Sequence, residues 1–121
     1  MSIVTEKRLK DRSGSVCEIS GSDENLVVYL VEPKAEAIPE NCILITKTLR
    51  DQIENKELMN ANDWRGLSDS MWNENLPVQI VSWRMHARLK NNDMLEMMYL
   101  DEDALEWAKA TGEDEEEKKK I

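Results

Sequence analysis

The residues of this chain that could do nucleophilic, acid–base or metal chemistry are few and widely spaced. His86 is the only histidine, and its neighbours one helical turn away, Ser82 and Lys90, supply no orienting carboxylate. The two cysteines, Cys17 and Cys42, have no cysteine partner at metal-ligand spacing. We therefore interpret His86 as a surface residue of a helix and expect no enzymatic activity.

The acidic cluster at residues 101–103 has a structural explanation. Asp101 precedes a predicted helix, where its carboxylate can accept hydrogen bonds from free backbone N–H groups, and acids in a first turn interact favourably with the helix dipole. The four glycines form neither GxGxxG nor GxxxxGK(S/T), two common phosphate-binding motifs. We expect no metal and no cofactor. We also expect ion pairs in the second half, in which Arg65, Arg84 and Arg88 pair with Asp69, Glu74 or Glu96.

Composition restricts the partners and the compartment. The chain has 121 residues, 25 Asp and Glu against 16 Lys and Arg, and a formal net charge of -9. This balance opposes binding to nucleic acid and to anionic lipid, so we expect neither a nucleic-acid nor a membrane partner. No apolar run has transmembrane length, and the basic N-terminus lacks the apolar segment of a signal peptide. We expect a cytoplasmic protein with reduced cysteines.

The first half must supply the β structure. A short polar helix is predicted over residues 2–12, with Gly14 at its end. Two apolar runs, residues 26–31 and 42–45, have the composition of buried strands. Residues 16–19 precede the first run across a turn-rich segment and are expected to pair with it as a hairpin.

The second half reads as helical. Thr46 is a predicted N-cap for a helix over residues 47–55, and the apolar spacing after Pro77 predicts a helix buried on more than one side. A Met-rich helix and a helix capped by Asp101 should follow. The charged blocks of residues 113–121 predict a flexible tail after a single domain at 1–112. The fold class is therefore α+β: a small antiparallel sheet followed by a packed helical C-terminal half.

Several blocks of the sequence, in this order and at this spacing, resemble the longer proteobacterial PhnA-like proteins of alkylphosphonate operons, a zinc-ribbon family. The resemblance covers residues 12–112. The matching blocks are Arg12–Ile19, Glu24–Leu26 with Val28–Tyr29, Gln52–Asn55, Trp64–Arg65 with Leu67–Trp72, Pro77–Gln79 with Trp83–Met85, Arg88–Lys90 and Met97–Glu102.

This resemblance implies a zinc site held by two Cys-x-x-Cys pairs, whose positions correspond here to Cys17, Ser20, Thr46 and Leu49. A closed tetrahedral zinc site needs four ligands, and one thiolate of four remains. Asp63 and Gly66 also depart from the family, in which His and Cys are common at these positions. We expect a degenerate, metal-free zinc ribbon in which a small apolar cluster around Leu49 fills the space of the ion.

These observations favour a non-catalytic protein-interaction module that binds a protein partner or itself. The candidate partner surface consists of large apolar side chains in the second half, for which core packing is the favoured explanation: Trp64, Trp72, Met94, Met97 and Met98. Two other functions stay open. One is an accessory protein or enzyme of alkylphosphonate metabolism, as the resemblance implies. The other is an acidic mimic of nucleic acid.

Overall fold

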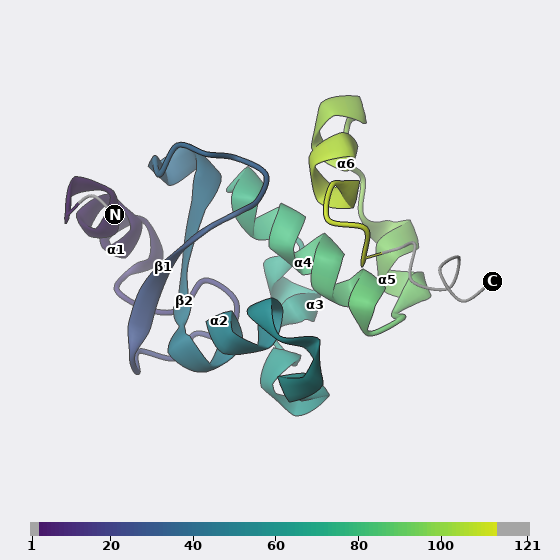
Figure 1. The fold of residues 1–121 in the computed structure, drawn as a ribbon, viewed down its shortest axis with the longest axis horizontal. Helices are drawn as coiled ribbons and strands as arrows, with labels where there is room; N and C mark the ends of the chain where they lie inside the picture. The colour runs from purple at the N-terminus through teal and green to yellow at the C-terminus, as the bar shows by residue number, and fades with distance from the viewer. Residues whose placement is uncertain (1–2, 114–121) are drawn as a thin grey trace.

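The computed structural model describes residues 3–113, which form one run of elements from α1 at one end to α5 and α6 at the other (Figure 1). The predicted tail from residue 114 onward lies outside the described residues. Glu113 was assigned to that tail, and this assignment is wrong. Its side chain is buried, and its carboxylate lies 2.7 Å from the guanidinium of Arg88.

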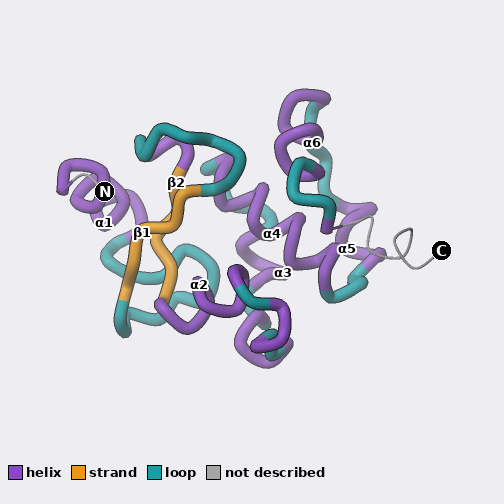
Figure 2. Tube along the Cα trace, in the orientation of Figure 1, coloured by secondary structure: helices purple, strands orange, loops and turns teal. Residues whose placement is uncertain are grey.

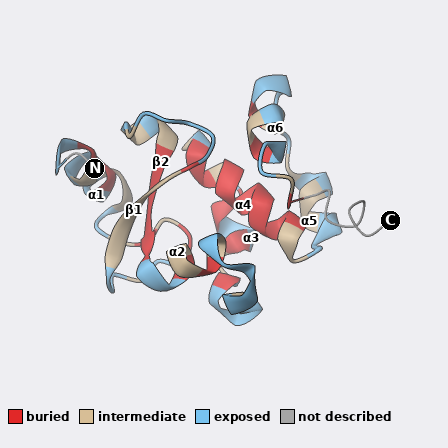
Figure 3. Cartoon of the chain, in the orientation of Figure 1, coloured by how far each residue is buried: buried red, intermediate tan, exposed pale blue. Residues whose placement is uncertain are grey.

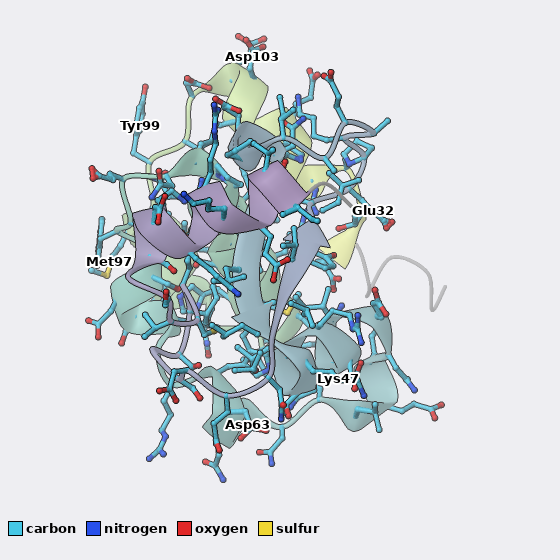
Figure 4. The ribbon with its side chains drawn as sticks, turned by 90° about the vertical axis from the view of Figure 1, so that its left-hand side faces the viewer. Glu32, Lys47, Asp63, Met97, Tyr99 and Asp103 are labelled. Carbon is cyan, nitrogen blue, oxygen red and sulfur yellow. The ribbon has the colours of Figure 1, made fainter. Side chains whose placement is uncertain are left out.

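The N-terminal part consists of α1 (Ile3–Ser13) packed on a two-stranded antiparallel sheet. Strand β1 (Leu26–Leu30) pairs with β2 (Cys42–Thr46) in a register that runs from Leu26 opposite Thr46 to Leu30 opposite Cys42. All five residues of β2 are buried, because three helices contact this strand. Helix α1 covers one face of the sheet, and α2 and α4 also pack on β2. In Figure 4, α1 lies across the two strands.

Residues 16–19 do not form the predicted hairpin strand. They form a turn that is tied to β2 by a single backbone hydrogen bond, in which Glu18 N–H donates to the Leu44 carbonyl at 2.8 Å. The physical reason lies in the Glu18 side chain, whose carboxylate accepts from Leu44 N–H at 2.9 Å and from the Arg12 guanidinium. These bonds occupy the edge of β2 beside the turn, and β1 pairs with its other edge.

The remaining elements are helical (Figure 2). The α-helices are α2 (Lys47–Glu54), α3 (Leu67–Ser70), α4 (Leu76–Arg88), α5 (Asn92–Met97) and α6 (Glu102–Lys109). Single 3-10 turns lie at Pro39–Asn41, Lys56–Leu58 and Ala61–Trp64. Both predicted caps are present: the Thr46 hydroxyl accepts from Leu49 N–H, and the Asp101 carboxylate accepts from Ala104 N–H.

The core is organised around α4, which contacts β2, α3, α5 and α6. Ten of its thirteen residues are buried, so it has no continuous solvent-facing stripe (Figure 3). The main core cluster joins α4 to Cys17, Leu49 and Trp64, and a smaller one lies under α1. The α+β fold class with a helical C-terminal half is confirmed. No helix within residues 3–113 has both the length and the apolar character needed to cross a membrane.

Candidate functional site

The positions that correspond to the zinc ligands of PhnA-like proteins lie around one groove. The groove has a volume of about 410 Å³ and is lined by Ser20, Thr46 and Leu49, three of the four positions. Asp63 and Gly66 line it too. The fourth position, Cys17, is buried in the same core cluster as Leu49. Segments that are far apart in the sequence therefore meet at the positions for which the resemblance implied zinc ligands.

The donor atoms at these positions are engaged within the protein. Ser20 N–H donates to the Cys17 sulfur at 3.3 Å, and Leu49 N–H donates to the Thr46 hydroxyl at 3.2 Å. Both pairs thus form similar turns, in which the backbone of the fourth residue bonds the side chain of the first. The Ser20 hydroxyl accepts from Ser22 N–H at 3.3 Å.

This donor set does not fit zinc. Structural zinc takes thiolate, imidazole or carboxylate ligands, whereas Leu49 has no lone pair and Thr46 serves as a helix cap. Among residues 3–113, no group of three or more His, Cys, Asp or Glu side chains is placed to hold a metal ion. Leu49 is buried in the core, as expected, but the space beyond it is a polar groove and is not filled by an apolar cluster.

The two other positions that depart from the family have structural roles. Asp63, which lies at the lower edge of the molecule in Figure 4, accepts a hydrogen bond from the Gln52 side chain at 2.8 Å. Gly66 contacts the turn that carries Cys17, and a Cβ at this position would lie 2.1 Å from the Ile19 carbonyl oxygen. A side chain larger than glycine at position 66 therefore requires this turn to move.

Only some residues of the predicted partner surface lie at the surface of the molecule. Trp64 is buried, and its indole N–H donates to Gln52 at 2.8 Å, so its assignment to the surface is wrong. Trp64 lies in the core because the apolar volume of α4 must be covered on this side. Met94 is half-buried and lines a different pocket.

Trp72, Met97 and Met98 do meet at the surface. They line a shallow groove of about 170 Å³ together with Tyr99, which the sequence analysis did not single out. Trp72 is 57% exposed, Met97 55% and Tyr99 89%. We call Trp72, Met97, Met98 and Tyr99 the apolar patch; Met97 and Tyr99 lie on the same side of the molecule in Figure 4. Tyr99 could have been found from its position between the Met-rich helix and the cap of α6.

His86 is not a surface residue, and that interpretation is wrong. It is 2% exposed because α3 and the turn at Ala61–Trp64 cover this side of α4. Its Nδ1 lies 3.1 Å from the Asn91 amide nitrogen, whereas Nε2 has no hydrogen-bond partner in the described part of the chain. Burial lowers the pKa of His86, and the Leu67 carbonyl opposes this shift only partly.

The cysteines are free thiols, and both are buried. Burial raises the pKa of Cys42, and the nearby Arg12 guanidinium opposes the shift. A protonated, occluded thiol is a poor nucleophile. Among residues 3–113, the Cys17 sulfur bonds Ser20 N–H and His86 Nδ1 bonds the Asn91 amide, and neither bond joins a nucleophile to a general base.

The predicted ion pairs of the arginines are also wrong. Arg84 and Arg88 point into the interior, where they bond backbone carbonyls and, for Arg88, Glu113. Arg65 donates to the Asn62 carbonyl. The sequence pattern did not predict that Arg84 and Arg88 are in the interior, because α4 is covered on nearly all sides.

Comparison with known proteins assigns no relatives: no protein-family model, no curated protein and no solved structure matches the chain. The site is therefore interpreted from its own geometry.

Proposed function

We propose that this chain is a non-catalytic, metal-free interaction domain related to the PhnA-like proteins, and that its apolar patch binds a basic segment of a partner protein. The observation that carries the proposal is the exposure of Trp72, Met97 and Tyr99 around one shallow groove. Large aromatic side chains supply most of the binding energy where proteins meet. Clustered exposure of this kind is typical of interaction sites.

The sequence segments that supply the patch are acidic, which favours a basic partner. The two segments that supply the patch, residues 66–83 and 91–108, contain eight Asp and Glu and no Lys or Arg, the acids being Asp69, Glu74, Asp93, Glu96, Asp101, Glu102, Asp103 and Glu106. An apolar surface on acidic segments complements a segment that carries both apolar and basic side chains. A second copy of this chain is disfavoured, because each copy carries a net charge of -9.

The relation to PhnA-like proteins is supported by the groove at Ser20, Thr46 and Leu49. The resemblance requires these positions, which are up to 29 residues apart in the sequence, to converge, and they line one groove. The alternatives of a role in alkylphosphonate metabolism and of nucleic-acid mimicry rest on the resemblance and on composition alone. No arrangement of the described side chains favours either.

Calorimetric titration with two model peptides tests the binding proposal. One is an amphipathic helix of Leu and Lys, and its counterpart has Glu in place of Lys. At about 150 mM salt we expect the Leu–Lys peptide to bind with a Kd of about 10 μM and the Leu–Glu peptide not to bind. The double variant Trp72→Ala and Tyr99→Ala should weaken binding by about tenfold or more.

Leu58→Ala is the matched control, because Leu58 is an exposed apolar side chain on a 3-10 turn outside the patch. It should leave the affinity unchanged. If the patch variant binds the Leu–Lys peptide as tightly as the control does, the attraction is only that of net charge, and the proposed site is wrong.

A further inference from the structure

A cavity of about 610 Å³ lies between β1, α2 and α4, away from both surfaces described above. Two arginines of α4, Arg84 and Arg88, line it from positions one helical turn apart. Glu32 lies at its rim, and Figure 4 shows Glu32 on the opposite side of the molecule from Met97 and Tyr99. The cavity is therefore distinct from the apolar patch.

The two guanidinium groups differ in how their charge is compensated. Arg88 forms a two-point ion pair with Glu113, with nitrogen–oxygen distances of 3.1 and 2.7 Å, and also donates to the carbonyls of Gln52 and Ile53. Its charge is neutralised and its N–H groups are occupied. Arg88 is therefore a structural residue.

Arg84 has no such counter-ion. It is 3% exposed, and its Nε and Nη2 donate only to the backbone carbonyls of Glu32, Trp107 and Ala108. No carboxylate within residues 3–113 lies within 4.0 Å of its guanidinium nitrogens. Nη1 has no acceptor among residues 3–113, and Arg84 lines the cavity.

A buried charge without a counter-ion is costly, because it loses hydration and gains no ionic partner. The carbonyls satisfy part of the hydrogen bonding of Arg84 but supply no negative charge. A carboxylate in the cavity would give Nη1 an acceptor and Arg84 its counter-ion. Glu113 and Glu32 act on Arg84 electrostatically from beyond ion-pair distance. Within residues 3–113, the position for a carboxylate in direct contact with its guanidinium is unfilled.

The other lining groups restrict the ligand further. Leu30, Ile53 and Met85 supply an apolar wall, and the rim carries Glu32 and Glu54. Arg50, the remaining cation at the cavity, lies 3.1 Å from Asp51 and 3.9 Å from the exposed carboxylate of Glu54. A doubly charged anion would be repelled by the rim carboxylates, whereas an ammonium group would be attracted to them.

We propose that the cavity binds a small zwitterion of the amino-acid class, with its carboxylate on Arg84 Nη1 and its ammonium group toward Glu32 and Glu54. An apolar side chain of the ligand packs on Leu30, Ile53 and Met85. This proposal is independent of the partner-binding patch, since none of its residues belongs to the patch.

Titration of isotope-labelled protein with L-leucine, followed by NMR, tests the site directly. We expect dose-dependent shifts of the Arg84 Nε–H signal, with a Kd of about 1 mM or tighter. Isocaproate, which lacks the ammonium group, and isopentylamine, which lacks the carboxylate, should each bind about fivefold more weakly or worse. If either analogue binds as tightly as leucine, the cavity does not recognise both charges and the proposed ligand class is wrong. If the Arg84 signal does not shift at about 20 mM leucine, the proposed binding site is wrong.

Variants at the rim give a test that does not depend on the core. Glu32 and Glu54 are exposed, so the double variant Glu32→Gln and Glu54→Gln should keep the fold. It should weaken leucine binding about fivefold and leave isocaproate binding unchanged or tighter. Glu57→Gln, at an exposed position outside the cavity, is the control and should change neither. Equal leucine affinity in the rim variant and the control contradicts the proposal.

Discussion

Buried polar side chains connect the segments of this molecule at the scale of single residues. The Gln52 side chain accepts from Trp64 and from Asn60 N–H and donates to Asp63, so it joins α2 to the following loop. A buried group that loses such a partner costs about 1–3 kcal/mol. His86 Nε2 is the one polar side-chain atom of the described residues that is fully buried without a partner. Its environment makes folding sensitive to pH.

Stability should decrease in acid because of His86. Its pKa is lowered in the folded protein, whereas the unfolded chain keeps the usual value of 6.5. Above pH 6.5 the residue is neutral in both states and adds no pH dependence. Below it the unfolded chain takes up the proton first, so the free energy of unfolding falls, by at most about 1.4 kcal/mol per pH unit, until the pH reaches the lowered pKa.

Urea unfolding of the wild type and of His86→Leu between about pH 7.5 and 5.5 measures this effect. At the upper pH the variant should be within about 1 kcal/mol of the wild type, because it removes an unpaired buried atom. Toward the lower pH the variant should lose less stability. If the free energies of unfolding of the two proteins fall in parallel with pH, folding does not lower the pKa of His86 and the prediction is wrong.

At the scale of elements, the helix starts could be predicted because a cap is a local interaction. Thr46 and Asp101 bond backbone groups three residues away, within one turn of each helix. The strand partner of β1 could not be predicted in the same way, since β2 follows after an intervening loop and residues 16–19 have a similar apolar pattern. The choice depends on Arg12 and Glu18, whose contact to β2 has no local signature.

Glu18→Gln should destabilise the fold by about 3 kcal/mol, the lower end of the range for breaking a buried ion pair. The side chain of Glu18 is 2% exposed and that of Arg12 18%, so the arginine would keep its charge without its partner. Glu6→Gln is the control, because its pair with Lys10 is 45% exposed on both sides and is worth about 0.3–0.5 kcal/mol. Denaturant unfolding of both variants gives the comparison. Equal losses of stability in the two variants would show that the Arg12–Glu18 ion pair contributes no more than the exposed Glu6–Lys10 pair.

At the scale of the whole molecule, the fold class and part of the surface followed from sequence patterns, whereas the cavity did not. Trp72 and Met97 lie at the surface because α5 and the loop after α3 are at the end of the core. Trp64 is as apolar as Trp72, and the sequence alone does not indicate which of the two tryptophans is buried in the core. The Arg84 cavity is formed by β1, α2, α4 and the segment after α6, so no single segment predicts it.

Packing, and not an ion, should hold the N-terminal part together. Purified protein should contain far less than one zinc per chain by elemental analysis, and a chelator should leave the thermal midpoint unchanged. The variant that introduces the ligands implied by the resemblance, Ser20→Cys with Thr46→Cys and Leu49→Cys, should bind one zinc ion, since these positions line one groove and Cys17 lies in the same core cluster as Leu49. Stoichiometric zinc in the unmodified protein would contradict the expectation.

The two-stranded sheet has a consequence for solutions of the protein. Within residues 3–113, β1 hydrogen-bonds to one neighbouring strand only, and its sequence, Leu-Val-Val-Tyr-Leu, carries no charge. An uncharged edge strand can serve as a template for adding strands from other molecules. Mutual repulsion of strongly anionic copies opposes that growth, and it vanishes as the medium approaches the isoelectric point near 4.7. Acidic storage conditions therefore favour fibrillar assembly.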